Sequence, residues 1–269
     1  RQVGTLAGTG RQSRVRVPGG ELRTTALNSP WDLTVLDGAL YVAMAGPHQL
    51  WRHRLGSDSI EVFAGTGRED ILDGALDACA LAQPSGITHD GKNLFIVDSE
   101  GSAVRRVTTG LGGSVTTLVG PHDLPNGASL FEFDDVDGVG DDVRLQHPIG
   151  LVYHDGALFV TDTYNHKIKR VDIKSRRCET WVGTGVRGET LSPLQLNEPA
   201  GVTVAKGQLY IADTNNHRLL TTDLETQTVR ELSIAGLTPP TPPRRQIDES
   251  AGLEVQALPT QAVRSGGPA

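Results

Sequence analysis

One polar pattern occurs twice in the sequence, with an Asp followed three residues later by Asn-His. It reads DTYNHK at residues 162–167 and DTNNHR at residues 213–218. Carboxylate, amide and imidazole groups can all do chemistry, and His is the commonest metal ligand in proteins. One interpretation is therefore a metal site that is formed by several such histidines. The other is structural, because Asp and Asn side chains readily bond backbone N–H groups in tight turns.

Repetition favours the structural interpretation, because a catalytic group is needed once whereas a turn is needed in every repeat. We expect the Asp to accept backbone hydrogen bonds inside its own turn and the His to pack against the neighbouring repeat. We expect no metal and no other cofactor. The residues assigned to this structural motif are Asp98, Asp162, Asn165, His166, Asp213, Asn216 and His217.

A second candidate is the acidic run at residues 134–142, DDVDGVGDD, which suggests calcium. A twelve-residue calcium loop starting at Asp135 would need an oxygen ligand in place of Val139 and a Glu in place of Gln146. Its Asp137-Gly138 pair matches Asp73-Gly74 in position before a later Pro. We therefore interpret the run mainly as a connector between repeats, with adventitious cation binding as the alternative.

These candidates lie within four repeated units. Each unit holds four short runs rich in Val, Ile, Thr and Tyr, separated by Gly, Asp and Asn, a pattern typical of β-strands. No segment has helical periodicity over a sufficient length. Four antiparallel strands per unit of about 40 residues predict the blades of a β-propeller. The units are residues 29–67, 83–120, 147–185 and 198–234.

The repeated text resembles the NHL repeat: Pro-x-Gly, a turn, an apolar run ending in Asp, then Asn-His and a basic residue. The segments 29–51, 83–105 and 131–150 further resemble the NHL domain of the thioredoxin–NHL family. This resemblance spans residues 1 to about 235. It implies a six-bladed ring, a thioredoxin-like domain before the propeller and a small β-domain after it.

Residues 3–8, VGTLAG, match the fourth strand of each unit, as in IEVFAG and CETWVG. We therefore predict an all-β, NHL-type propeller with about four complete four-stranded blades plus one extra outer strand, an incomplete part of a six-bladed ring. The propeller segment is residues 1–235. Residues 236–269 are expected to form a Pro-rich linker and a mobile tail, because prolines at 239–243 remove backbone donors.

Composition narrows the function. The net charge of −7 argues against sequence-independent nucleic-acid binding, which depends on Lys and Arg. No apolar run approaches the roughly 18 residues of a membrane helix. Cys79 and Cys178 align with apolar positions of the other units, so both are expected to be buried and unpaired. The resemblance places any thiol chemistry in the thioredoxin-like domain.

We expect a non-catalytic interaction or scaffold module whose partner is a protein or a covalently linked thioredoxin-like domain. Insertions on one face of a repeat array usually mark the binding side, which here means the connectors 65–83, 120–147 and 184–198. The candidate binding residues are Asp73, His122, Phe131, Phe133, Asp134, Asp135, Asp137, Asp141, Asp142, His147 and Asn197.

Two other functions remain open at this point. A lactonase-like or metal-dependent lyase-like enzyme would use carboxylates and His at the central channel, but the strands expected there carry few carboxylates. An RNA-binding NHL domain would need a basic rim with exposed aromatic side chains, and the basic residues are scattered. The channel candidates are Thr34, Thr88, Tyr153, Thr203, His89 and His154.

Overall fold

The computed structural model describes residues 2–125, 129 and 132–236, and the structural statements below concern these residues. The chain divides into two compact units, residues 1–238 and 239–269. The predicted linker and tail at 236–269 lie outside the described residues except for Gly236. No described helix is long and apolar enough to cross a membrane.

Four antiparallel sheets follow one another along the chain, at the positions predicted for the four units. The described chain is all-β apart from three one-turn 3₁₀ segments, Gly140–Asp142, Thr163–Asn165 and Thr214–Asn216. The first sheet contains β2 (Pro30–Leu36), β3 (Ala39–Met44), β4 (Gln49–Arg54) and β5 (Ser59–Ala64). The second contains β7 (Pro84–His89), β8 (Asn93–Asp98), β9 (Ala103–Thr108) and β10 (Ser114–Val119). The third contains β12 (Pro148–His154), β13 (Ala157–Asp162), β14 (Lys167–Asp172) and β15 (Arg177–Val182). The fourth contains β16 (Pro199–Ala205), β17 (Gln208–Asp213), β18 (Arg218–Asp223) and β19 (Val229–Glu231).

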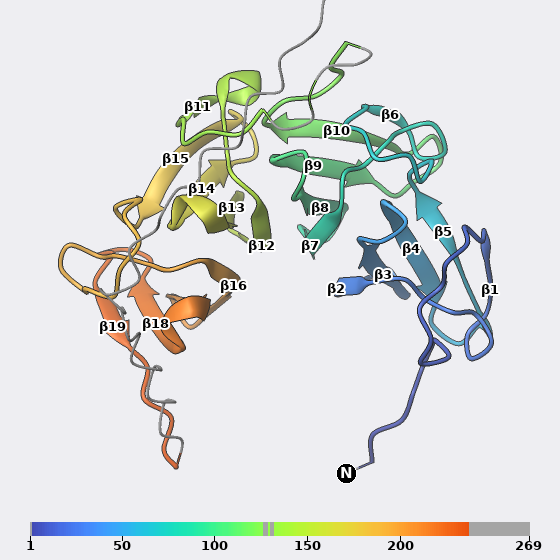
Figure 1. Ribbon diagram of the computed structural model, residues 1–269, viewed down its shortest axis with the longest axis horizontal. Coiled ribbons are helices and arrows are strands. Elements are labelled where there is room, and N and C mark those ends of the chain that lie inside the picture. The colour runs from blue at the N-terminus through green and yellow to red at the C-terminus, as the bar shows by residue number, and fades with distance from the viewer. Residues whose placement is uncertain (1, 126–128, 130–131, 237–269) are drawn as a thin grey trace, which may run out of the picture. The chain divides into compact units, whose positions relative to one another are not determined.

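The sheets are arranged as propeller blades (Figure 1), with the inner strands β2, β7, β12 and β16 side by side in that order. Apolar side chains fill the spaces between sheets. Ile87 of the second sheet, for example, shares one buried cluster with Tyr41 and Phe63 of the first. Close approach of the inner strands requires glycine: a Cβ on Gly150 would lie 2.3 Å from the carbonyl oxygen of Ala200.

Three very short strands extend the outer edges of the first three sheets. β1 (Gly19–Glu21) pairs with β5, β6 (Gly74–Ala75) with β10, and β11 (Gly138–Val139) with β15. Each belongs to the segment that precedes its sheet in the chain, so the entering connector is fastened to the outer edge of that sheet. The described part of the fourth sheet has four strands.

The prediction of an extra outer strand at residues 3–8 is wrong, because these residues form no strand in the structure. Val3 is fully exposed, and Gly8 N–H donates to Leu22 O at 2.8 Å. A strand needs ladder hydrogen bonds to a neighbouring strand. The outer edge of the first sheet is paired with β1, at residues 19–21, and no described strand pairs with residues 3–8.

Candidate functional site on the connector rim

The connector rim is the side of the propeller that carries the connectors 65–83, 120–147 and 184–198 together with the turns between the second and third strands of each sheet. Asp98, Asp162 and Asp213 end the second strands of their sheets and are fully buried. The backbone N–H groups of Ala82, Gln146 and Asn197 donate to their Oδ1 atoms, each at 2.7 Å. The expectation that these donors lie inside the Asn-His turn is wrong, since they lie on the connector 16 residues earlier.

The asparagines fasten the same turn to the same connector. Asn165 Nδ2 donates to Asp162 Oδ2 and to the carbonyl oxygen of Asp134, both at 2.8 Å. Asn216 Nδ2 donates in the same way to Asp213 Oδ2, at 2.8 Å, and to Gly188 O, at 2.7 Å. Each Asp–Asn pair therefore ties a turn to the connector that enters its sheet.

The histidines join successive sheets. His166 has left-handed backbone angles, with φ of 54°, and its Nδ1 accepts the N–H of Glu198 at 3.2 Å. His48 accepts the N–H of Gln83 at 3.2 Å. In the second sheet, Ser102 replaces His and its Oγ accepts the N–H of His147 at 3.4 Å. Burial lowers the pKa values of His48 and His166, which keeps their Nδ1 atoms available as acceptors.

Two buried cations, which the sequence analysis did not predict, lie near the aspartates of two of these turns. The fully buried guanidinium of Arg105 contacts Asp98 Oδ2 at 3.0 Å and Asp73 Oδ1 at 2.8 Å. The fully buried Lys169 Nζ lies 2.7 Å from Asp137 and 3.9 Å from Asp162. Arg105 pairs with Ile96, and Lys169 with the equivalent Val160, so the two cations are in the same register. Each is the third residue of the third strand of its sheet, and this repeated basic position was the signal in the sequence that could have identified them.

The first sheet replaces this polar set with an apolar one. Met44 stands where the other sheets have Asp, and Trp51 occupies the register of the buried cations. Both side chains are buried, and Trp51 Nε1 donates to Gln49 Oε1 at 3.1 Å. The connector residue changes with them, because Gly19 precedes the outer-strand Gly20 as Asp73 precedes Gly74. The acid, the cation and the connector Asp are thus replaced together.

Lys169 also accounts for two carboxylates of the acidic run at 134–142, Asp135 and Asp137. Its Nζ contacts Asp135 Oδ1 at 2.6 Å, and Asp135 forms a second ion pair with Lys167. Asp137 additionally accepts the N–H of Thr180 at 2.8 Å. Burial opposes ionisation of Asp135 and Asp137, but the hydrogen bonds from the lysines outweigh it and lower both pKa values. These carboxylates are engaged by an ammonium group from the protein itself, as fits a connector.

Burial has the opposite net result for Asp98 and Asp162, two of the three motif aspartates. It raises the pKa of Asp98 to about 6 and that of Asp162 to about 7, against the opposing influence of Arg105 and of Gln146 N–H with Asn165, respectively. Because Asp98 contacts a guanidinium that is always protonated, we regard it as ionised at neutral pH. The stability of the fold therefore depends on the hydrogen bonds and charges that surround these two buried carboxyl groups.

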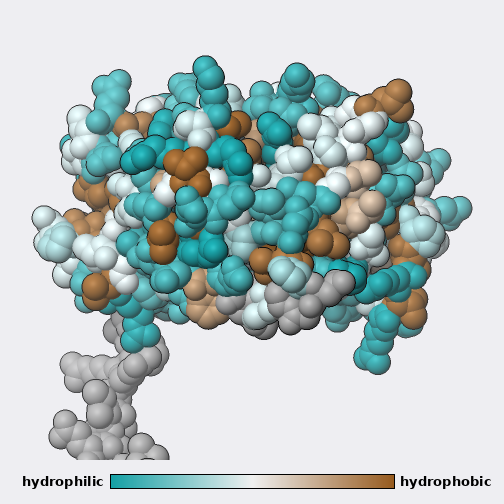
Figure 2. Space-filling view, turned by 90° about the horizontal axis from the view of Figure 1, so that it is seen from above, coloured by the Kyte–Doolittle hydropathy of each residue, from teal (hydrophilic) through white to brown (hydrophobic). Residues whose placement is uncertain are grey.

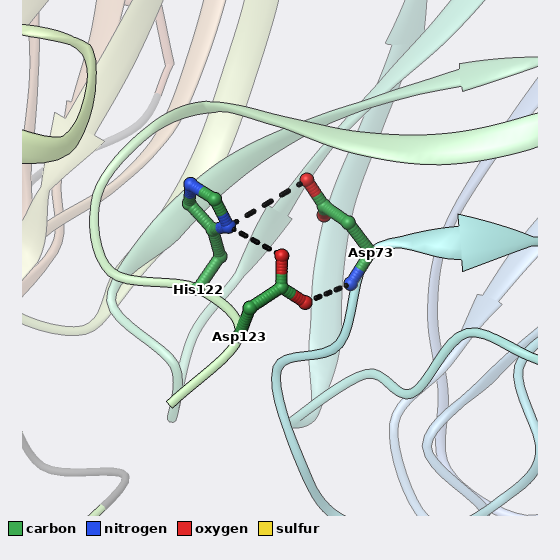
Figure 3. A group of neighbouring side chains, drawn as sticks. All are labelled: Asp73, His122 and Asp123. Atoms are coloured by element: carbon green, nitrogen blue, oxygen red, sulfur yellow. Dashed lines mark hydrogen bonds and ion pairs between the residues drawn. The ribbon is translucent and has the colours of Figure 1, made fainter. Parts of the chain in front are cut away.

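Asp73, His122 and Asp123 form a close group where two connectors meet (Figure 3). His122 Nδ1 lies 2.9 Å from Asp123 Oδ2 and 3.8 Å from Asp73 Oδ2, and Asp73 N–H donates to Asp123 Oδ1 at 2.9 Å. The three side chains are close enough to share a cation. However, Asp73 already accepts hydrogen bonds from Arg105 and Thr117, and the nearby guanidinium opposes a metal ion.

This group is better described as a charged clamp between connectors. On its other side, His122 Nε2 lies 3.3 Å from Asp141 Oδ1, and Asp141 pairs with Arg176 at 2.6 Å. Burial lowers the pKa of His122, but the three surrounding carboxylates outweigh this and raise it. The clamp is therefore strongest when His122 is protonated.

Aromatic side chains lie exposed on the same rim. Phe133 is 43% exposed and Tyr164 is 46% exposed. The His147 ring lies between them, 6.3 Å from Phe133 and 4.7 Å from Tyr164. We call Phe133, His147 and Tyr164 the rim aromatic cluster. Tyr164 was not among the predicted residues, although it directly precedes the Asn-His pair, and Phe131 lies outside the described residues.

Exposed carboxylates lie on the connector 120–147, which also carries Phe133 and His147. Asp134 and Asp142 are exposed, and His147 Nε2 lies 3.2 Å from Glu100. Much of the remaining surface is hydrophilic, with isolated hydrophobic side chains, as Figure 2 shows for one face. The structure thus places Asp73, His122 and Asp141 in one group and Phe133, Asp134 and His147 in another, while Asn197 belongs to the fourth-sheet turn.

The four sheets and the Asp–Asn–His turn define an NHL-type β-propeller segment. The NHL repeat family matches at residues 196–221. The chain is also 39% identical over 259 residues to Protein SUPPRESSOR OF QUENCHING 1, chloroplastic, of Arabidopsis thaliana, covering 91% of this chain and 24% of that protein. It therefore carries NHL repeats and resembles the NHL domain of the thioredoxin–NHL family.

Two further relatives have a similar level of sequence identity to this chain. NHL repeat-containing protein 2 of Bos taurus is 39% identical over 259 residues, covering 84% of this chain and 35% of that protein. The Homo sapiens protein of the same name is 38% identical, covering 87% and 36%. The chain thus spans about a quarter to a third of the length of these relatives. Among solved structures, virginiamycin B lyase of Staphylococcus aureus with quinupristin has a TM-score of 0.49 at 16% identity, covering 77% of this chain and 56% of that one.

Proposed function

We propose that this propeller is a non-catalytic protein-interaction module that binds a protein partner, or a covalently linked thioredoxin-like domain, through the connector rim. The observation that carries the proposal is the rim aromatic cluster. Aromatic side chains dominate the binding energy of protein interfaces, and Phe133 and Tyr164 expose their rings at the junction of the second and third sheets.

The charges of the rim suggest the partner's chemistry. Asp134 and Asp142 are exposed, with no ion pair to the rest of the described chain. A basic partner surface could pair with these carboxylates and place Lys or Arg side chains over the aromatic rings. Charge pairing of this kind speeds association and weakens with salt, since the screening length is about 8 Å at physiological ionic strength.

The test is a calorimetric titration of the chain with the thioredoxin-like domain of a thioredoxin–NHL relative. The double variant Phe133→Ser/Tyr164→Ser should weaken binding by about tenfold or more. In stopped-flow mixing of the same two proteins, Asp134→Asn/Asp142→Asn should slow association, a change that added salt should mimic. Asp135 is left unchanged because it pairs with the buried Lys169.

Leu111→Ser is the matched control, because Leu111 is fully exposed in the turn between β9 and β10, on the opposite rim. It should bind like the unchanged chain. An absence of binding by the unchanged chain, or equal weakening by Leu111→Ser, would contradict the proposal. Binding that vanishes on addition of a chelator would instead indicate a metal-dependent contact.

A further inference from the structure

A pocket of about 190 Å³ lies on the connector rim at the first sheet, between the connector that enters this sheet and the turn between β3 and β4. Arg14 and Arg16 line it, and none of the lining residues carries a carboxylate. Both arginines are exposed, and neither forms an ion pair with the described residues. The pocket is smaller than the usual small-ligand site of about 300–1,000 Å³, so it suits a single charged group. The lining residues of interest are Ser13, Arg14, Arg16, Asn28, Gly46 and Pro47.

The connector of the first sheet has three additional residues beside this pocket. Ser13 N–H donates to Leu27 O at 2.9 Å, and these two residues are 14 positions apart. The corresponding bond of the second connector, from Asp70 N–H to Leu81 O, spans 11 positions, as does its equivalent in the third connector. The first connector therefore contains an insertion of three residues relative to the next two.

The insertion lies before the outer strand. Gly20 of β1 and Gly74 of β6 occupy equivalent places on their sheets, and both precede the leucine of their connector by seven positions. The additional residues therefore fall between Ser13 and β1, in the stretch that carries Arg14 and Arg16. Insertions on one face of a repeat array usually mark its binding side.

The turn beside the insertion lacks the groups that join turn and connector in the other sheets. In the third and fourth sheets, Asn165 and Asn216 donate from the turn to a connector carbonyl, at 2.8 and 2.7 Å. Pro47 occupies this position in the first sheet, and its side chain has no donor. In the second sheet the position is Gly101, where a Cβ would lie 2.4 Å from Ile71 Cγ2 of the connector. The first sheet has neither the amide bond nor this close packing, and the pocket lies in the resulting space.

The polar side chains of the pocket offer mainly hydrogen-bond donors. Asn28 Oδ1 accepts Gln12 Nε2 at 2.7 Å, whereas Asn28 Nδ2 donates to none of the described residues. Gly46 allows Asn28 to occupy this place, because a Cβ on Gly46 would lie 2.2 Å from Asn28 Oδ1. Each guanidinium adds up to five N–H donors. The pocket therefore calls for a ligand with negative charge and several acceptor oxygens.

The charge of the connectors also changes sign at the first sheet. Residues 1–28 carry five arginines and one glutamate, whereas the connector 120–147 carries seven carboxylates and one arginine. Local charge of one sign raises the concentration of ligands of the opposite sign at a surface. Although the whole chain is acidic, this part of its rim attracts anions.

We propose that this pocket binds a phosphate monoester group. Such a group carries nearly two negative charges and three acceptor oxygens, which match the guanidinium groups of Arg14 and Arg16 and the Asn28 amide. A carboxylate, with one charge and two oxygens, would leave one guanidinium without a counterion. Small phosphate esters and phosphorylated side chains share this chemistry. The site is separate from the rim aromatic cluster between the second and third sheets, so the two proposals stand or fall separately.

The N–H resonances of the complete chain give a direct readout in NMR spectra. Titration with glycerol 3-phosphate, at about pH 7 and constant ionic strength, should shift the Asn28 side-chain amide and the backbone N–H groups of Arg14 and Arg16 in a saturable way. The backbone N–H of Arg23, an exposed residue of the same connector that does not line the pocket, should stay in place. Acetate at the same ionic strength should bind much more weakly.

Arg14→Gln and Arg16→Gln should each weaken binding about three- to fivefold, as expected for exposed charge pairs, and the double variant about tenfold or more. Arg14→Lys/Arg16→Lys should bind with intermediate affinity, because Lys keeps the charge but lacks the planar fork that matches phosphate oxygens. Arg23→Gln is the matched control and should have no effect. All of these positions are exposed, so the variants should keep the melting temperature of the unchanged chain.

A second probe identifies the source of the phosphate. The peptide Gly-Gly-phosphoserine-Gly-Gly should bind more tightly than glycerol 3-phosphate if phosphorylated proteins are the natural ligand, and equally if a small ester is. The proposal is overturned if glycerol 3-phosphate leaves the Asn28 amide unmoved or if acetate binds equally well. It is also overturned if Arg14→Gln/Arg16→Gln retains full affinity, or if Arg23→Gln weakens binding as much as that double variant.

Discussion

His166 Nδ1 accepts the backbone N–H of Glu198 at 3.2 Å, and this bond links the turn of the third sheet to the residue directly before the first strand of the fourth. His166→Ala would leave that N–H without its partner and should lower the free energy of unfolding by about 1–2 kcal/mol. His166→Asn should be nearly neutral, because Asn places an acceptor at similar reach and tolerates left-handed backbone angles. Urea unfolding of the two variants checks this, and equal losses would show that the acceptor is unimportant.

The same bond predicts a pH dependence. Burial lowers the pKa of His166, so its contribution to stability is present above the unfolded pKa of about 6.5 and is lost as pH falls through the lower folded value. His122 has the opposite sign. Its folded pKa is raised, since Asp123, Asp73 and Asp141 outweigh the effect of burial. Its contribution is present below about pH 6.5 and is lost as pH rises through the folded value.

The histidine signals in NMR should therefore separate, with His166 titrating below and His122 above the usual midpoint. His122→Gln should remove part of the stability loss that occurs above neutral pH, and His166→Asn part of the loss on acidification. If both histidines titrate at the ordinary value, neither the clamp around His122 nor the hydrogen bond between His166 and Glu198 depends on protonation.

Asp162→Ala would remove the acceptor of the Gln146 N–H and of Asn165 Nδ2, and would take a carboxylate away from Lys169. We expect a loss of about 3 kcal/mol in unfolding free energy, as is typical when one partner of a buried charged network is deleted. Binding to the rim partner should persist at temperatures where the variant is folded. The control is Asp77→Ala, an exposed position, which should change stability by less than about 0.5 kcal/mol. Abolished binding with unchanged stability would make the motif a binding site rather than a structural one.

Calcium should not alter the melting temperature of the unchanged chain, because Lys169 Nζ already pairs with Asp135 and Asp137. Lys169→Met removes that ammonium group, leaving the carboxylates close together without it. Calcium should then raise the melting temperature of this variant, which will start from a lower value. Stabilisation of the unchanged chain by calcium, reversed by a chelator, would restore the calcium interpretation of the acidic run.

Cys79 and Cys178 are buried and unpaired, as the sequence predicted. Burial raises the pKa of Cys79 to about 11 and that of Cys178 to about 12. Since the thiolate is the reactive form, a thiol reagent should label neither residue quickly in the native chain and both in denaturant. Rapid native labelling of Cys79 would reopen a redox role for this chain.

The sequence was sufficient for the blades because strand runs and turn residues recur in each unit, and all four sheets lie where those runs predict. It was insufficient for the donors of the motif aspartates, since Gln146 and Asn197 contribute backbone N–H groups, which no residue type reveals. Residues 3–8 resemble a fourth strand, but strand formation depends on hydrogen bonds to a neighbouring strand, which the local sequence does not encode.

The candidate site was predicted in part. Acidic connector residues could be read from their repeated positions, whereas the engagement of Asp135 and Asp137 by Lys169 depends on a contact 32 to 34 residues along the chain. The exposure of the Phe133 and Tyr164 rings likewise follows from packing between two sheets and not from their neighbours in sequence.

The coordinated replacement in the first sheet bears on how such a domain can be rebuilt. Trp51 and Met44 suit a connector that carries Gly19, while Arg105 and Asp98 require one that carries Asp73. A graft that moved only a four-stranded sheet into another propeller would bring a buried cation without its second counterion. The transplantable module is therefore the sheet together with the connector before it, and the cut points for building chimeras fall directly after a fourth strand and before the next connector.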